Sequence, residues 1–155
     1  MQRHREGRML TKLLPDQVSK FWDIIRYAIE QSLPPIAGEH PDKMKNILMS
    51  LLSSKSQCWA SYDIKEDRRI LEAIVITRIF YDDASDTKSL LIYCLYGYEH
   101  IKQSSFTNGL KTLVKFAKSE GCERVISYTN EPGIVELINR LGGDTSYTFI
   151  SVPLY

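Results

Sequence analysis

The stretch 99–109 (EHIKQSSFTNG) concentrates side chains that could bind an anionic ligand. Lys102 brings a positive charge, and the hydroxyl groups of Ser104, Ser105 and Thr107 can donate hydrogen bonds to phosphate oxygens. A helix that begins here would add the positive end of its dipole and its free N–H groups. These residues are compatible with a modified phosphate site, but the interpretation that the sequence favours is a helix start that Thr107 caps.

Two residues of the same stretch, Glu99 and His100, could act as general bases that accept a proton directly or through water. They follow a predicted strand, so the alternative is a solvated strand end. Glu72 is a weaker candidate for the same role, because it stands alone on an otherwise apolar strand face. Its alternative is a wet position at the end of that strand.

Composition and charge argue against several classes of protein. With 20 basic and 19 acidic residues, the net charge is +1, and a dedicated nucleic-acid-binding protein usually shows a basic excess. Three cysteines and three histidines show no metal-ligand spacing, so we expect no metal site. The odd number of cysteines favours free thiols in a reducing compartment. No signal peptide and no apolar run of about 18 residues is present, which predicts a cytoplasmic protein without a membrane segment.

The first 12 residues are predicted to be a basic N-terminal arm, and residues 13–155 a single domain. The arm is either a solvated tail or a segment that docks on a partner or on phosphates. The arm contains one acidic residue and the following basic residues: Arg3, His4, Arg5, Arg8 and Lys12.

Helical spacing of apolar residues predicts two N-terminal helices. The first begins at Pro15, in the first turn where its missing N–H costs nothing, and ends near Pro34. The second covers about 40–52. Three segments rich in β-branched and aromatic residues follow, at 57–62, 70–81 and 90–98, and predict an antiparallel meander.

The segment 70–81 is predicted to be a central strand because both of its faces are apolar. Strict alternation assigns one face to Leu71, Ala73, Val75, Thr77 and Ile79, and the other to Ile74, Ile76 and Phe80.

The rest of the chain alternates between helices and strands. A helix between Thr107 and Gly121 leads to a strand at 124–129, and a short helix opened by Asn130 leads to a final strand at 147–152. An antiparallel meander followed by a β-α-β unit predicts an α/β fold with a mixed sheet and helices on both faces.

Two motifs connect this pattern to a known family. The helix that starts near Asn108 ends in Ala117-x-x-x-Gly121-Cys122 before a strand, and Asn130 is followed by Leu-Ile-Asn-Arg-Leu-Gly-Gly at 137–143. These features resemble the GNAT superfamily of N-acetyltransferases from about Leu10 onward, with the pyrophosphate-loop helix and the Asn…Leu-Tyr-x-x-x-Gly-Phe segment of that family. A finer resemblance, through the strand of Trp59, the strand of Ile74 and the Arg-Leu-Gly-Gly ending, is to small GNAT-like proteins of tailed phages, some of them virion components.

The resemblance implies acetyl-CoA as cofactor and an amine as acceptor. Transferred onto this sequence, the cofactor-binding positions are Gln103, Ser104, Ser105, Thr107, Asn108 and Asn130. Here the sequence departs from the family pattern Arg/Gln-x-x-Gly-x-Gly/Ala, in which glycines let the backbone approach the pyrophosphate. Starting from Gln103, the glycine positions hold Phe106 and Asn108; counting back from Gly121, they hold Ser104 and Phe106.

A second departure concerns the tyrosine that protonates the departing thiolate in many family members. Ile138 stands at that position, and Tyr128 or Tyr147 could substitute from neighbouring strands. Tyr93, Tyr96 and Tyr98 surround Gly97, which suggests a bulge or a close backbone approach; without a bulge, Tyr93 faces away from the other two.

Two functions follow from this reading. The first is a non-catalytic or weakly active structural or accessory protein of a phage, which binds a protein partner of the virion or host. The alternative is a divergent acetyl-CoA-dependent N-acetyltransferase with an amine substrate. Neither reading involves nucleic acid or a membrane.

Overall fold

The computed structural model describes residues 9–99 and 101–154 of the chain. Among these residues, five strands form one sheet in the order β1-β2-β3-β4-β5. Antiparallel pairing joins β1 through β4, and β5 is parallel to β4. The strands are β1 (Leu10–Lys12), β2 (Ser56–Lys65), β3 (Arg68–Asp82), β4 (Thr87–Gly97) and β5 (Arg124–Ser127). This is the mixed sheet predicted from the sequence.

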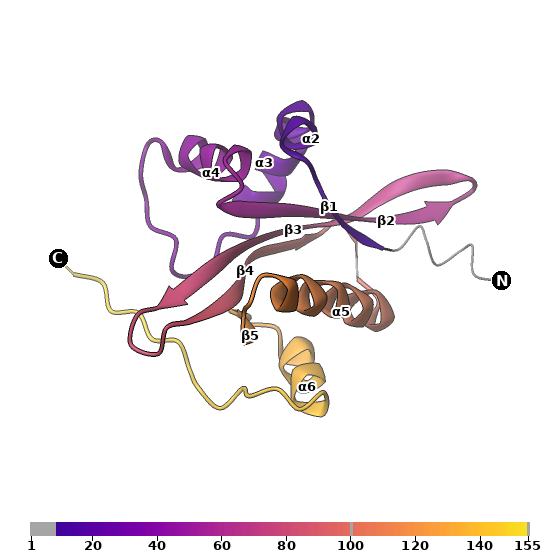
Figure 1. The fold of residues 1–155 in the computed structure, drawn as a ribbon. Helices are drawn as coiled ribbons and strands as arrows, with labels where there is room; N and C mark the ends of the chain where they lie inside the picture. The colour runs from indigo at the N-terminus through magenta and orange to yellow at the C-terminus, as the bar shows by residue number, and fades with distance from the viewer. Residues whose placement is uncertain (1–8, 100, 155) are drawn as a thin grey trace.

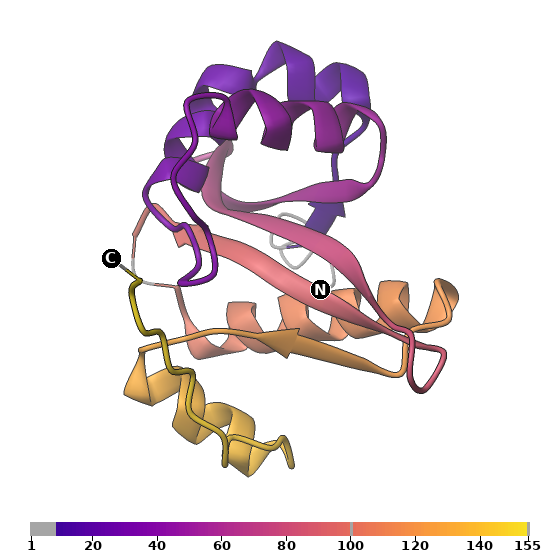
Figure 2. The ribbon, with the colours of Figure 1, turned by 90° about the vertical axis from the view of Figure 1, so that its left-hand side faces the viewer.

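Helices cover both faces of the sheet, as predicted (Figure 1). One face carries α2 (Pro15–Lys20), α3 (Trp22–Glu30) and α4 (Lys43–Leu52). The other carries α5 (Gln103–Ser119). The last helix, α6 (Pro132–Arg140), lies next to β5 (Figure 2).

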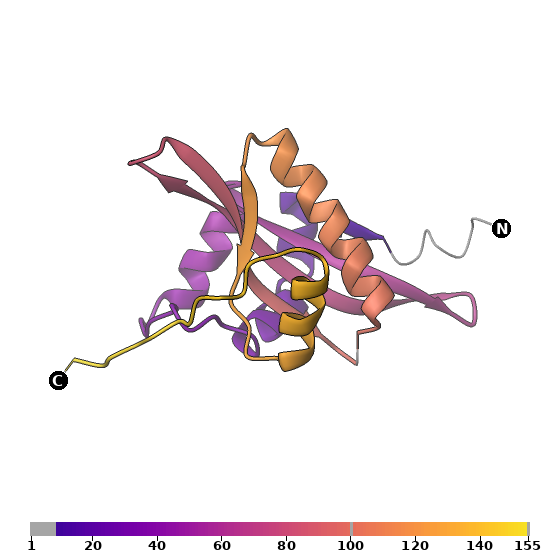
Figure 3. The same ribbon diagram turned by 90° about the horizontal axis from the view of Figure 1, so that it is seen from below.

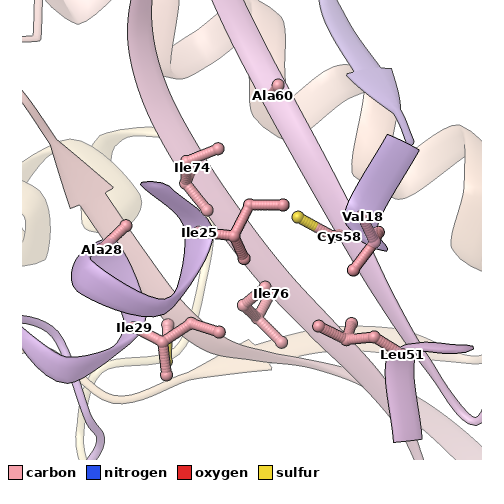
Figure 4. Close-up of a cluster of buried hydrophobic side chains, with 10 residues drawn as sticks. Val18, Ile25, Ala28, Ile29, Leu51, Cys58, Ala60, Ile74 and Ile76 are labelled. Carbon is pink, nitrogen blue, oxygen red and sulfur yellow. The ribbon is translucent and has the colours of Figure 1, made fainter. Parts of the chain in front are cut away.

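Each face of the sheet has its own apolar core. In the first core, Ile25 and Ile29 of α3 point toward Cys58 of β2 and Ile74 and Ile76 of β3 (Figure 4). In the second, α5 packs over a different set of sheet residues: Leu10, Trp59, Val75 and Leu90. Full burial of an aliphatic side chain contributes roughly 1.5–3 kcal/mol. The two cores therefore hold the N-terminal helices and α5 firmly to opposite sides.

The predicted end of α5 is confirmed. Gly121 follows the helix with a φ of 76°, a left-handed conformation that glycine adopts without steric cost. The N–H of Cys122 then donates a hydrogen bond to the carbonyl oxygen of Ala117 at 2.8 Å. This turn directs the chain from α5 straight into β5.

The N-terminal part differs from the sequence prediction in two ways. Leu10–Lys12, assigned to the basic arm, pairs with Trp59–Ser61 as β1, and Leu10 is buried. The rest of the arm, residues 1–8, lies outside the described residues. In addition, the expected first helix is interrupted at Phe21, whose φ of −106° and ψ of 22° leave the helical region. Periodicity did not reveal this interruption because the i−4 hydrogen bonds continue through it.

The final strand predicted at 147–152 is not formed, because no strand of the described chain pairs with this segment. Its alternating side chains have the pattern of a strand, but the segment crosses the chain near the carboxyl end of β5 and leaves the sheet (Figure 3). The alternation of apolar and polar residues indicates which side chains could share one face of a strand. The strand itself forms only where a neighbouring strand is available for pairing. Within residues 9–99 and 101–154, no helix has the length and apolar character that crossing a bilayer requires.

Candidate functional site

Helix α5 begins at Gln103, four residues before the predicted cap at Thr107. Its N-cap residue is Lys102, and within the described chain no side chain caps the helix. Thr107 lies in the second turn instead, where its hydroxyl donates a hydrogen bond to the carbonyl oxygen of Gln103 at 2.9 Å. The first N–H groups of a helix have no intrahelical acceptor, so an uncapped N-terminus attracts anions.

Ser105 lies in the first turn of α5 and faces the sheet. Its residue is only 8% exposed, and among the described residues its hydroxyl oxygen has no hydrogen-bond partner. A buried hydroxyl without a partner costs about 1–3 kcal/mol. Gln103 and Ser104 are exposed on the outer side of the same turn, and Asn108 is exposed in the next. The predicted cofactor-binding residues of this turn therefore divide between the outside of the helix and the interior.

A β-bulge places Glu72 opposite this turn. Ser61 pairs with Ala73 and Tyr62 pairs with Leu71, so Glu72 is an extra residue in β3. The hydroxyl of Ser61 donates a hydrogen bond to Glu72 Oε1 at 3.0 Å. Because the bulge interrupts the alternation, the predicted faces of this strand were wrong at Leu71, which packs in the first core.

The two elements enclose a cavity of about 50 Å³ between the sheet and α5. Its polar groups are Ser61, Glu72 and Ser105. Its other walls are mainly apolar and include Phe106, Leu110 and Val75. A space of this size holds a few water molecules or a small organic group. Ser61 carried no signal in the sequence, because a serine on an alternating strand is unremarkable without its bulged neighbour.

Phe106 forms part of the cavity wall, on the side of α5 that faces the sheet. The sequence placed this residue where a side chain would crowd the phosphates of a cofactor. In the structure its ring is half-buried under the helix, with Ser105, Leu110 and Leu113 along the same wall. The outer side of the first turn therefore keeps only Gln103 and Ser104 as exposed side chains.

Strands β4 and β5 part next to this turn. Their parallel pairing covers Ser89–Ile92 with Arg124–Ser127 and stops there. At that point β4 has a bulge, since Ile76 pairs with Cys94 and Thr77 with Ile92, which leaves Tyr93 as the extra residue. Ligands of open α/β sheets bind beyond the carboxyl ends of parallel strands where the strand order changes. The uncapped end of α5 follows the carboxyl end of β4.

The bulge in β4 lies at Tyr93 rather than at Gly97, the glycine that suggested it. It turns Tyr93 to the same side as Tyr96 and Tyr98, against the first core. The rings of Tyr96 and Tyr98 meet edge to face at 4.9 Å, and Tyr27 of α3 meets Tyr96 at 5.9 Å. Burial, reinforced by Tyr96, raises the pKa of Tyr98. These tyrosines lie under the N-terminal helices, on the opposite face from the cavity.

Gly97 ends β4 where the loop before α5 folds back. A Cβ atom at this position would lie 2.8 Å from the Ile101 side chain and 3.1 Å from the Glu99 carbonyl oxygen. Ile101 in turn contributes to the cavity wall. Because Gly97 has no side chain, Ile101 can pack against it and form one wall of the cavity.

Of the two bases proposed from the sequence, only Glu99 is described by the structure, and it lies outside the cavity wall. The side chain of Glu99 is 78% exposed and forms an ion pair with Lys65 at 3.4 Å. It is not part of the cavity wall, and an exposed ion pair contributes little to stability. His100 lies outside the described residues. The weaker candidate, Glu72, is the carboxylate that faces the cavity.

The remaining predicted positions do not line the cavity. Asn130 is exposed, and the N-cap of α6 is Glu131 rather than Asn130. The carbonyl oxygen of Ile138 accepts a hydrogen bond from the N–H of Gly143 at 2.9 Å. Tyr147 is 89% exposed, and neither it nor Tyr128 lines the cavity.

The cysteines do not form a site among the described residues. All three are free, and burial raises the pKa of Cys58 and of Cys94 to about 12. Both thiols therefore stay protonated and inert at neutral pH. In the described part of the chain no group of three or more potential metal ligands is found.

Comparisons with known proteins agree on the fold. No protein-family model matches the sequence, and no curated protein matches it. Solved structures do match along nearly their whole length. AAC(6')-Iy, in complex with the bisubstrate analog CoA-S-monomethyl-acetylneamine, has a TM-score of 0.64 and 13% identity, with 94% of this chain and 97% of that chain covered.

Two further acetyltransferases match similarly. An aminoglycoside acetyltransferase, HMB0005, from an uncultured soil metagenomic sample has a TM-score of 0.64 and 11% identity, with coverage of 94% and 97%. The ribosomal-protein-alanine N-acetyltransferase of Brucella melitensis biovar Abortus 2308 has a TM-score of 0.61 and 9% identity, with coverage of 94% and 99%. At such identities the similarity establishes the architecture. The chain has the GNAT fold of N-acetyltransferases.

Proposed function

We propose that this protein is a divergent acetyl-CoA-dependent N-acetyltransferase that acts on a small amine. The observation that carries the proposal is the pairing of Ser105 and Glu72 in one cavity beside an uncapped helix N-terminus. An orphaned buried hydroxyl is a cost to the folded protein that a ligand would relieve. Glu72 is the extra residue of a β-bulge, and β-bulges occur often next to active sites, where they redirect a side chain.

The outer end of α5 suits the phosphates of acetyl-CoA. Its first N–H groups point out of the helix, Ser104 adds an exposed hydroxyl, and Lys102 adds a positive charge. The parting of β4 and β5 after Ile92 leaves the edge of β4 without a strand partner in the described chain, next to this end. The glycines that bring the backbone close to a pyrophosphate are absent, so we expect weaker binding than in a complete motif.

The cavity side chains suit amine attack on a thioester. Acetyl-CoA, when bound, would supply an acetyl group whose carbonyl carbon forms the new C–N bond as the C–S bond breaks, and CoA would leave as a thiolate that takes its proton from water. Glu72 binds the amine and accepts its proton, and Ser61 orients that carboxylate. Ser105 donates a hydrogen bond to the oxygen that becomes negative, and a buried donor acts strongly in such a site.

The cavity also restricts the size and polarity of the amine that could be the acceptor. Its walls are mainly apolar around one carboxylate, and its volume is about 50 Å³. A primary amine on a short apolar body satisfies both features, because the ammonium pairs with Glu72 while the body covers Val75 and Leu110. The three free thiols suit a reducing cytoplasm as the place of action.

The test is acetyl transfer to a panel of short primary amines, with the product measured by mass spectrometry. Glu72→Gln keeps the hydrogen bond from Ser61 and removes the base, so we expect kcat to fall about 100-fold or more. Glu99→Gln is the matched control, because that carboxylate is exposed and outside the cavity. Equal losses in the two variants, or a loss only in Glu99→Gln, would refute the assignment of Glu72.

The second candidate is the non-catalytic accessory protein, including the phage or virion component suggested by the sequence. The observation that favours it is Ile138 at the family's acid position, with Tyr147 too exposed to replace it. A thermal-shift titration with acetyl-CoA and free CoA separates the two candidates, because a ligand that binds only the folded protein at 100 times its Kd stabilises it by about 2.7 kcal/mol. No shift with either compound would favour a protein partner over an amine substrate.

A further inference from the structure

The C-terminal segment 145–154 exposes an unusual number of apolar side chains. Tyr147 is 89% exposed, Ile150 79%, Val152 73% and Leu154 94%. The segment (TSYTFISVPL) contains no charged residue, and its β-branched and aromatic side chains are typical of a strand. An uncharged stretch of this kind in water is a binding surface or an aggregation hazard.

The sheet presents a matching unpaired edge. β5 is the last strand of the sheet, and in the described chain it pairs only with β4. A free edge offers a row of N–H and C=O groups to any extended segment that reaches it. The C-terminal segment does pass the carboxyl end of this strand, where the rings of Tyr128 and Phe149 meet at 5.3 Å.

The path of the segment favours the edge of another molecule. After Phe149 the chain continues away from β5 and from the sheet, as two views show (Figures 1 and 3). The outer edge of its own β5 therefore stays unpaired in the described chain, and the backbone of 150–154 extends beyond the sheet. Each molecule carries both an open edge and a free strand.

We propose that two copies of this chain form a dimer by exchanging these segments. Residues 147–152 of each copy add as a strand to the outer edge of β5 of the other. A two-fold pair satisfies both edges at once and closes the assembly, whereas a one-way addition would leave an open end and continue into a fibre. The absence of charge lets the two segments lie near the symmetry axis without repulsion.

The buried surface is adequate for a stable pair. Each copy contributes two aromatic side chains to the proposed interface, Tyr147 and Phe149. An aromatic side chain can bury roughly 150–250 Å². Together with Ile150, Val152 and Leu154, the two copies would bury on the order of 1,000 Å² or more, which is the range of a specific interface. The backbone hydrogen bonds of two added strands come in addition.

The first experiment measures molecular mass in solution by light scattering during gel filtration. We expect the full chain to be a dimer and the double variant Ile150→Lys/Val152→Lys to be a monomer. Both side chains are more than 70% exposed within one chain, so lysine there leaves the monomer's fold intact. Met49→Lys, at another exposed apolar residue on α4, is the control and should remain a dimer. A monomeric full chain would overturn the proposal.

The second experiment distinguishes exchange from pairing within one chain. In a Cys122→Ser background, one preparation carries Ser127→Cys in β5 and the other carries Ile150→Cys; the remaining cysteines are buried. Mixed and treated with a short bismaleimide, the two should form a crosslinked heterodimer. If a crosslink forms only when both substitutions are in the same chain, the segment pairs with its own β5 and the proposal is wrong. Neither experiment depends on activity.

Discussion

Replacing Ser105 by alanine should make the protein more stable and a poorer enzyme. The residue is 8% exposed and its hydroxyl has no partner among the described residues. An unsatisfied buried hydroxyl costs about 1–3 kcal/mol, and its removal leaves a space of only one atom. We therefore expect Ser105→Ala to raise the free energy of unfolding by about 1–2 kcal/mol.

The gain can be measured by thermal and urea unfolding. For a chain of this length, 1 kcal/mol moves the midpoint by about 2–4 °C. Ser104→Ala is the matched control, because Ser104 is exposed one residue earlier in the same helical turn. It carries the same change in helix propensity and should alter the midpoint much less.

The same substitution should reduce acetyl transfer by about 100-fold, the usual loss when one donor to a developing oxyanion is removed. Ser104→Ala should mainly weaken the binding of CoA. If Ser105→Ala lowers the unfolding midpoint, the hydroxyl has a partner and the reasoning about the cavity fails. If it raises the midpoint but leaves transfer unchanged, Ser105 has no role in the reaction.

Three further predictions concern the framework of the site. Gly97→Ala should lower stability by about 1–3 kcal/mol in urea unfolding, because the new Cβ would lie 2.8 Å from Ile101; an unchanged midpoint would show that the loop moves freely. Thr77→Val should cost about 1–3 kcal/mol, because the indole N–H of Trp59 now donates to the Thr77 hydroxyl at 2.9 Å, and Thr77→Ser should recover most of the loss. Burial raises the pKa of Cys58 from 9.0 to about 12, so its contribution to stability is complete below pH 9 and should be lost between pH 9 and 12, by up to about 1.4 kcal/mol per pH unit. Urea midpoints across this range should fall less steeply in Cys58→Ala, and equal slopes would contradict the prediction.

The order of elements and most of the fold could be predicted from the sequence, because they depend on local chemistry. The apolar spacing of α3 and α4 and the glycine after α5 each act over a few residues. Gly121 has the left-handed φ that its place between Ala117 and Cys122 indicated. The two-sided apolar pattern of β3 correctly identified a central strand.

The candidate site could be predicted only in part. The hydroxyl-rich start of α5 was identified, with Ser105 among its members. That Glu72 rather than Glu99 lines the cavity could not be predicted, because alternation put Glu72 on the face of Ile74. A bulge of one residue reverses that assignment, and a bulge arises from how β2 and β3 pair along their whole length.

Two other features depended on the tertiary structure alone. The direction of Phe106 follows from where α5 begins, which is at Gln103 rather than at the predicted cap Thr107. The segment 147–152 has the residues of a strand, but whether it forms one depends on a neighbouring edge. By itself the sequence determined which segments can be helices or strands; the positions of side chains across the sheet were decided by long-range pairing, which local patterns do not encode.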